Sequence, residues 1–199
     1  MTDFTPEQTE KLETYLNLLR KWQKTINLVS NSTLNDAWER HIHDSAQLSD
    51  HIPRGAHLLD IGSGGGFPAL VLAIIRPDVT VTMVESDTRK CTFLQTVARE
   101  TSTHVKVLNE RIEDVPPHSS YDVITARAFA CVEKILYLTR SFFIKNPELF
   151  CLLLKGENAD EEIREARQIY DFSLEDTQSL TNTKSKILKI WNVSRETSF

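Results

Sequence analysis

The chain has 199 residues and a formal net charge of −5 at pH 7, and 40% of its residues are apolar. This length fits one large domain or one domain with a small appendage, and the composition is ordinary for a globular protein. The acidic balance excludes a protein coated in basic residues, so any contact with nucleic acid must come from a local patch.

Cysteine and histidine spacing argues against a bound metal. Cys91, Cys131 and Cys151 are odd in number and far apart, which favours neither a disulfide framework nor a zinc site. His41 and His43 are two residues apart, which places them on different sides of a helix. We expect reduced thiols and a cytoplasmic location. The chain starts with acidic and polar residues rather than a signal-like pattern, and its longest apolar run is far too short for a membrane span.

Residues 1–55 predict a helical appendage. Thr5 followed by Pro6 is a helix-start pattern, and apolar side chains then recur at helical spacing as far as Ile26. The opposite face of this helix is basic, and a solvated surface is favoured there over direct ligand contact. A polar stretch at residues 31–35 breaks the helix, and a second, short helix is expected to end near residues 53–55.

From residue 57 onward, strand and helix patterns alternate, which predicts an α/β domain over residues 56–199 with a parallel sheet. Strands are expected near 57–61, 79–85, 104–109, 121–125 and 149–154, followed by a last pair at 172–177 and 185–193. Helices are expected near 67–76, 88–101, 131–144 and 159–170.

Residues 58–75, LLDIGSGGGFPALVLAII, predict a buried strand, a tight glycine turn and the start of a helix. Gly62, Gly64 and Gly66 have no Cβ, so the backbone can adopt positive φ and approach a ligand closely. In a dinucleotide-binding fingerprint counted from Gly62, the third glycine would fall on Phe67. Counted from Gly64, it would fall on Ala69, where alanine is tolerated. The turn therefore indicates a nucleotide-type ligand, and the dinucleotide spacing stays open as the second alternative.

Glu85 ends the second predicted strand, 23 residues after Gly62. A carboxylate at this position can accept hydrogen bonds from both ribose hydroxyls of an adenosine. S-adenosylmethionine is therefore the first candidate ligand and NAD the second. A tight strand–helix connection that binds no ligand is the remaining alternative.

The other strand ends also carry polar residues, and ligands of parallel α/β sheets bind at these ends. Residues 109–114 follow the third strand, where an acidic side chain and backbone groups can reach an adenine amino group. Arg127 follows the fourth strand, beside the expected methyl-donor end of the ligand, and residues 155–157 follow the fifth. A purely structural role stays open for single residues, such as Glu113 capping the turn before Pro116.

Residues 125–129, Thr-Ala-Arg-Ala-Phe, narrow the reaction class. Enzymes that methylate exocyclic amines of adenine or cytosine usually carry Asn/Asp-Pro-Pro-aromatic there. A pyrimidine-carbon methyltransferase needs a cysteine nucleophile, whereas Cys131 falls in the next predicted helix, where we expect a packed thiol. Arg127 stays protonated, so it binds or orients rather than acting as a base. A purine ring nitrogen needs no base, so we expect catalysis by positioning and assign no catalytic residue.

Six stretches together resemble the bacterial RsmG family, also called glucose-inhibited division protein B, the 16S ribosomal RNA guanine-N7 methyltransferases. They are Trp22 with Asn27-Leu28, RHIHDS at residues 40–45, LLDIGSGGGFP, Glu85 with Arg89-Lys90 and Phe93-Leu94, RIED, and ITARAFA. The resemblance extends from about residue 15 to residue 191, and RHIHDS and ARAFA are much more specific than the glycine turn.

This resemblance implies a class I S-adenosylmethionine-dependent methyltransferase, with a Rossmann-like, mostly parallel seven-stranded sheet. It implies S-adenosylmethionine as methyl donor and N7 of a guanine in the decoding-region 530 loop of 16S rRNA as acceptor. The partner would be 16S rRNA or the small ribosomal subunit, with no obligate protein partner and no membrane.

Motif and strand-end positions together give the expected site. The cofactor-binding residues would be Gly62, Gly64, Phe67, Glu85, Ile112, Glu113 and Arg127. Candidate substrate contacts, from a motif that faces the same pocket, are Arg40, His41, Asp44 and Ser45. Contact with RNA would be mostly to phosphates, through Arg20, Lys21, Lys24, Arg40, Arg89, Lys90 and Arg127.

Two other functions stay open. A small-molecule methyltransferase can use the same fold, because fold does not determine the acceptor, and turnover without RNA would identify it. A non-catalytic RNA-binding assembly factor would keep the fold and fail to bind the cofactor.

Overall fold

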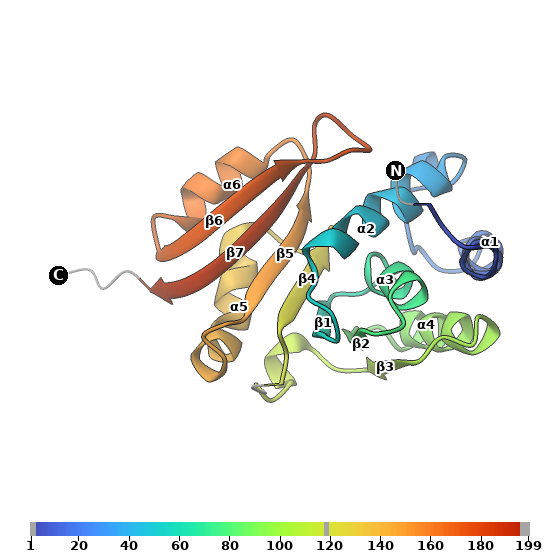
Figure 1. Ribbon diagram of the computed structural model, residues 1–199, viewed down its shortest axis with the longest axis horizontal. Helices are drawn as coiled ribbons and strands as arrows, with labels where there is room; N and C mark the ends of the chain where they lie inside the picture. The colour runs from blue at the N-terminus through green and yellow to red at the C-terminus, as the bar shows by residue number, and fades with distance from the viewer. Residues whose placement is uncertain (1–2, 118–119, 196–199) are drawn as a thin grey trace.

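The computed structural model describes residues 3–117 and 120–195, so the ends of the predicted ranges, 1–2 and 196–199, lie outside the described residues. A seven-stranded sheet lies between two groups of helices (Figure 1). The strands are β1 (His57–Ile61), β2 (Thr80–Val84), β3 (Val105–Leu108), β4 (Val123–Arg127), β5 (Phe150–Lys155), β6 (Tyr170–Gln178) and β7 (Lys186–Arg195). The helices are α1 (Pro6–Trp22), α2 (Asp44–Ala46), α3 (Ala69–Ile75), α4 (Thr88–Glu100), α5 (Val132–Lys145) and α6 (Ala159–Ala166). Short helical turns are η1 (Asn31–Thr33), η2 (Trp38–His43), η3 (Gln47–His51) and η4 (Ile112–Asp114).

The strand order is β3-β2-β1-β4-β5-β7-β6, with β1 to β5 parallel and β7 antiparallel to both β5 and β6. The predicted fold class, a mostly parallel seven-stranded Rossmann-like sheet with an N-terminal helix, is confirmed. The chain order reverses between β1 and β4, and parallel α/β sheets bind ligands at the carboxyl ends of the strands at such a switch point.

Each face of the sheet has its own apolar core. One core joins the first four helices to the sheet and includes Leu12 of α1, Leu70 of α3 and Phe93 of α4. The other lies under α5 and α6 and includes Phe142 and Ile163. Figure 1 shows α1, α3 and α4 gathered at one side of the molecule and the β6–β7 hairpin with α6 at the other. None of the helices in the described ranges is both long and apolar enough to cross a membrane.

The predicted appendage contains one regular α-helix and, after it, a series of short helical turns of different types. Its first helix starts with Thr5 as N-cap in a capping box, as the sequence indicates. The second predicted helix is a continuous series of π, α and 3-10 turns from Trp38 to His51. Of the two histidines in the RHIHDS motif, His41 is buried, whereas His43 is partly exposed and stacks on Phe4.

Two boundaries that affect the site differ from the predictions. The fourth strand covers 123–127 rather than 121–125, because β5 pairs with it as far as Arg127 opposite Leu154. Arg127 is therefore the last residue of a strand and not part of the loop after it. The helix predicted from residue 67 begins at Ala69, so Phe67 lies in the turn. Near the other end of the domain, the helix predicted over 159–170 stops at Ala166.

The prediction for Cys131 is also wrong. We expected a packed thiol inside a helix, but this residue is the N-cap of α5 and is exposed. The helix begins one residue later, at Val132, which is buried. Cys91 and Cys151 are buried and free, and burial raises the pKa of the Cys151 thiol to about 12.

Gly66 is one position of the glycine turn that needs glycine. Its φ is +89°, and a Cβ there would lie 2.5 Å from Leu70 and 2.8 Å from the Tyr15 hydroxyl. Gly55 also has positive φ, at +73°, but its Cβ would meet nothing within 4 Å. Gly156 combines open space with an ordinary backbone conformation.

These three glycines give a graded stability prediction. Gly66→Ala should lower the free energy of unfolding by about 2–4 kcal/mol, because backbone strain and overpacking add. Gly55→Ala should cost about 1–2 kcal/mol from strain alone, and Gly156→Ala should stay within about 0.5 kcal/mol of wild type. Urea unfolding monitored by circular dichroism measures all three, and equal losses for Gly66→Ala and Gly156→Ala would contradict this account of the turn.

Candidate active site

A cavity of about 650 Å³ opens at the switch point of the sheet, a volume typical of small-molecule sites. It lies beyond the ends of β1, β2 and β4 and is closed on one side by residues 28–33 of the appendage. All seven residues expected to bind cofactor line this one cavity, namely Gly62, Gly64, Phe67, Glu85, Ile112, Glu113 and Arg127.

Glu85 is fixed beside the glycine turn by backbone hydrogen bonds. The Gly64 N–H donates to its Oε2 at 2.8 Å, and the Asp87 N–H donates to its Oε1 at 2.9 Å. Each carboxylate oxygen has a second acceptor direction, so the side chain is held in place without losing its capacity to accept from a ligand. The Asn109 amide group donates to the Glu85 and Ser86 carbonyls, which joins the ends of β2 and β3.

Ile112 and Glu113 reach the cavity from the short turn η4 after β3. The Ile112 side chain is buried in the second core, whereas Glu113 is exposed. Burial of Ile112 anchors the turn, and this leaves the backbone of the turn and the Glu113 carboxylate as the polar groups at that wall.

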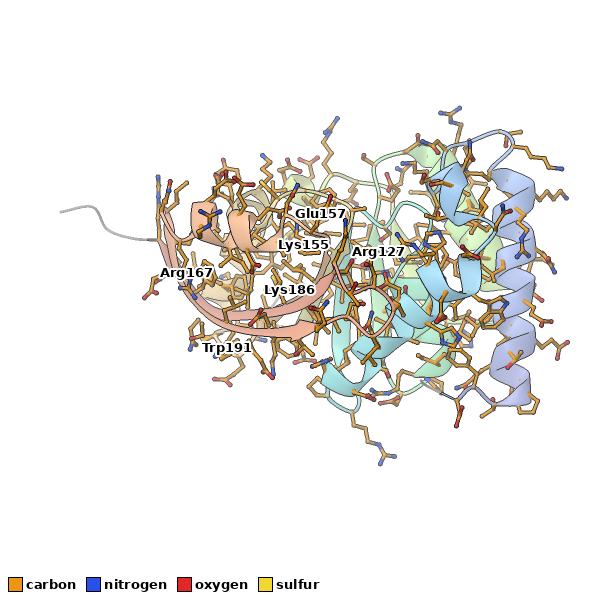
Figure 2. The ribbon with its side chains drawn as sticks, turned by 90° about the horizontal axis from the view of Figure 1, so that it is seen from above. Arg127, Lys155, Glu157, Arg167, Lys186 and Trp191 are labelled. Carbon is orange, nitrogen blue, oxygen red and sulfur yellow. The ribbon has the colours of Figure 1, made fainter. Side chains whose placement is uncertain are left out.

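Arg127 joins the end of β4 to the appendage (Figure 2). Its Nη2 donates to the Arg40 carbonyl at 2.7 Å and to His41 Nδ1 at 2.8 Å. Its Nε lies 3.5 Å from Asp44 Oδ2, and the guanidinium lies 5.7 Å from the centroid of the Phe67 ring. Its remaining nitrogen, Nη1, is buried and has no hydrogen-bond partner among the described residues.

The contact with Arg127 fixes the tautomer of His41. Because a guanidinium only donates, His41 Nδ1 must accept, and the ring proton is on Nε2. Nε2 then donates to the Thr33 hydroxyl at 2.8 Å, and Thr33 donates to the Ser30 carbonyl at 2.7 Å. Burial, with Arg127 and Arg40 nearby, lowers the pKa of His41 to about 3. His41 is therefore neutral at physiological pH, and its two ring nitrogens connect Arg127 to Thr33 of the appendage by hydrogen bonds.

The four candidate substrate contacts in the RHIHDS motif have different positions. His41 lines the main cavity, whereas Arg40 and Asp44 line a second, adjoining cavity of about 430 Å³. Asp44 Oδ1 accepts from the Thr181 hydroxyl at 2.7 Å, so the motif also holds the β6–β7 loop. Ser45 is fully buried and lines neither cavity.

Phe67 lies in a stack of aromatic rings rather than facing open space. Its ring is 5.0 Å from Tyr15 of α1 and 4.7 Å from His41, both nearly parallel to it. The Tyr15 hydroxyl donates to the Gly65 carbonyl. The glycine turn is therefore supported from below by the first helix of the appendage.

Several residues at these cavities were not singled out as site residues from the sequence. Thr33 belongs to the polar stretch at residues 31–35, which predicts only a helix break, and Ser30 directly precedes that stretch. Phe129 belongs to a strand-end motif that assigns it no role of its own. Glu162, on α6, carries no recognisable signal because it belongs to an exposed acidic stretch of that helix and reaches the second cavity only through folding.

The fold defined by this sheet and cavity is that of class I S-adenosylmethionine-dependent methyltransferases. The chain is similar to magnesium protoporphyrin IX methyltransferase from Synechocystis, solved with bound SAM, with a TM-score of 0.61 and 13% identity over 96% of this chain and 99% of that one. It is also similar to the tRNA methyltransferase TrmK of Bacillus subtilis, with a TM-score of 0.56 and 16% identity over 74% of this chain and 64% of that one. At these identities the likeness shows the fold.

The sequence comparisons identify the family of the chain, which is narrower than its fold class. Residues 8–191 match the model of rRNA small subunit methyltransferase G. The ribosomal RNA small subunit methyltransferase G of Paramagnetospirillum magneticum is 44% identical over 95% of this chain and 91% of its own length, and that of Rickettsia felis is 39% identical over 98% and 99%. The chain belongs to this methyltransferase G family, as the sequence motifs predict.

Asp60 lies near the end of β1, just before the glycine turn, and is a buried acid with a raised pKa. Its Oδ1 accepts from the Thr125 hydroxyl at 2.6 Å, and its Oδ2 is buried without a partner among the described residues. Burial, reinforced by the nearby Glu85 charge, raises the pKa of Asp60 from 3.8 to about 7. The folded protein therefore favours the protonated carboxyl group.

This shift predicts a pH-dependent loss of stability. The folded form of Asp60 binds a proton more tightly than the unfolded form, so its contribution is complete below pH 3.8 and is lost as the pH rises through 7. Between pH 4 and pH 8, wild type should lose about 4 kcal/mol of unfolding free energy relative to Asp60→Asn, which does not titrate. Urea unfolding of both proteins across this range measures the difference, and parallel pH profiles would refute it.

Proposed function

We propose that this protein transfers the methyl group of S-adenosylmethionine to N7 of a guanine in the decoding-region 530 loop of 16S rRNA. One observation carries the proposal: the seven residues expected to bind the cofactor all line a single cavity at the sheet's switch point. Membership in the methyltransferase G family supports a small-subunit rRNA substrate, and such a substrate implies action in the cytoplasm.

The geometry suits an adenosine-containing donor in one orientation. Glu85 would accept from the ribose hydroxyls with its free acceptor directions, and the turn at Ile112 and Glu113 would meet the adenine. Gly62 and Gly64 would lie against the methionine part of the donor. The methyl group would then point toward the turn that follows Arg127, where the second cavity begins.

The chemistry of the site fits an acceptor that needs no deprotonation. N7 of guanine has a free lone pair, so the protein must hold it in line with the methyl group and exclude water. His41 has a pKa of about 3 and is already hydrogen-bonded through both ring nitrogens. Arg127 remains charged and serves to orient rather than to accept a proton.

RNA contact would come from a basic surface on neighbouring helices. Arg20, Lys21 and Lys24 are exposed on or just after α1, and Arg89 is exposed on α4, which packs against α1. Lys90 is partly exposed and lines the main cavity. Arg40 is exposed at the second cavity, whereas Arg127 is engaged internally. This arrangement lets an acidic protein present a local cationic face to phosphates.

The competing functions make different predictions. A small-molecule methyltransferase would turn over without RNA, and an assembly factor without catalysis would not bind S-adenosylmethionine. No obligate protein partner is part of this proposal.

The direct test is methylation of unmodified small ribosomal subunits, with naked 16S rRNA in a parallel reaction and labelled S-adenosylmethionine in both. Nuclease digestion and mass spectrometry should show 7-methylguanosine at one position in the 530 loop. Parallel samples supplied with S-adenosylhomocysteine in large excess should show strong inhibition. Label that appears only in protein or small molecules, or at another base position, would reject the proposed acceptor.

A further inference from the structure

The second cavity adjoins the first and shares the segment that separates them. Both are lined by Arg127, Ala128, Phe129 and Ala130. The second cavity, of about 430 Å³, extends from this segment to the end of β5 and to the β6–β7 loop. Figure 2 shows Arg127 and Lys155 near each other at the middle of the molecule, far from Trp191 and Arg167 on the hairpin side. A molecule in one cavity is therefore directly next to a molecule in the other.

Phe129 forms an aromatic boundary between the two cavities. Ala128 has a positive φ of +50°, which turns the chain sharply at this point. The ring lies against the glycine turn, since a Cβ on Gly62 would be only 2.1 Å from it, and yet the residue is 37% exposed. An exposed aromatic ring held on a fixed turn is a surface on which a nucleic-acid base can stack.

The walls of the second cavity offer groups of both charges. Glu162 accepts at Oε2 from Lys155 Nζ at 2.7 Å and from the Val132 N–H at 3.0 Å. Its other oxygen, Oε1, has no hydrogen-bond partner within the described ranges. Lys155 also donates to the Ala130 carbonyl, so this ion pair fixes the turn that carries Phe129.

The buried guanidinium of Arg127 points to a ligand independently. Its Nη1 has no partner in the described part of the chain, and Arg127 borders both cavities. A buried donor without a partner is costly, and a ligand acceptor at the junction of the two cavities would satisfy it.

We propose that the second cavity binds the acceptor guanine base, flipped out of its RNA, and that Glu162 reads its Watson–Crick edge. This inference rests on the proposed function and adds the location and recognition of the acceptor. Guanine presents N1–H and the N2 amino group side by side, and the two free acceptor directions of Glu162 Oε1 can receive both. Adenine has an acceptor at N1, so a carboxylate in the same place would reject it.

The same contact favours the reaction itself. The N7 lone pair forms the new C–N bond while the bond from methyl carbon to sulfur breaks, and that electron pair stays on sulfur. The purine becomes cationic and no proton is transferred. As positive charge moves onto the ring, N1–H and N2–H become stronger donors, so their bonds to Glu162 strengthen from ground state to transition state.

Glu162→Gln is the variant that separates base reading from loop support. Glutamine keeps the length of the side chain and one oxygen that can accept from Lys155 and the Val132 N–H. The other terminal atom becomes an amide nitrogen, a donor where the guanine edge also donates. Glu161→Gln is the matched control, because Glu161 is the neighbouring residue on α6, is exposed and lies outside both cavities.

Two measurements decide the proposal. The first is single-turnover methylation of small subunits at saturating S-adenosylmethionine. Glu162→Gln should slow methylation by about tenfold or more, and Glu161→Gln should match wild type. The second is NMR titration of each protein, saturated with S-adenosylhomocysteine, with guanosine and inosine monophosphates. Inosine lacks the N2 amino group, so wild type should bind it about tenfold more weakly, and Glu162→Gln should bind both nucleotides equally.

The outcomes separate this inference from the proposed function. If wild type forms 7-methylguanosine and Glu162→Gln keeps either the wild-type rate or the wild-type preference for guanosine monophosphate, Glu162 does not read the base and the inference fails alone. Absence of nucleotide binding to wild type would also overturn it. If wild type forms no 7-methylguanosine in RNA, the proposed function fails first.

Discussion

The arrangement of the site depends on the hydrogen bonds and the ion pair that the Arg127 guanidinium makes. This guanidinium is placed at the end of a central strand, and its nitrogens reach the Arg40 carbonyl, His41 and Asp44. Asp44 in turn holds Thr181 in the β6–β7 loop. Segments that are more than 80 residues apart in sequence therefore meet at one planar, permanently charged group. Without it, the sheet, the appendage and the hairpin would lose this common contact, and the two cavities would lose one of the residues that line both.

The appendage is part of the cavity rather than a separate addition. The Gln23 side chain accepts from the Leu28 and Val29 N–H groups and donates to the Val29 carbonyl, which shapes the wall beside the glycine turn. Tyr15 supports that turn from below. The glycine turn at the main cavity thus rests on packing between α1 and the first strand–helix unit, and this explains why one apolar core contains residues from both predicted parts.

Features of the fold that depend on neighbouring residues are predictable from the sequence, and features that depend on contacts between distant segments are not. Apolar strand runs and the glycine turn are determined by neighbouring residues, so the seven strands, the turn and Glu85 were predictable. The end of β4 was misplaced because it depends on pairing with β5. The exposure of Cys131 depends on where α5 begins, and Glu162 reaches the second cavity only because α6 folds back on that edge. Contacts between distant segments produce no periodic pattern of apolar residues in the sequence, so the sequence does not predict them.

We propose that the main cavity binds the methyl donor with its reactive end toward the turn after Arg127. A crystal structure of the protein with S-adenosylhomocysteine tests it most directly. The ribose hydroxyls should lie within hydrogen-bonding distance of Glu85, the adenine beside Ile112 and Glu113, and the sulfur at the boundary with the second cavity. A ligand bound elsewhere, or bound with its sulfur directed away from Phe129, would contradict the account.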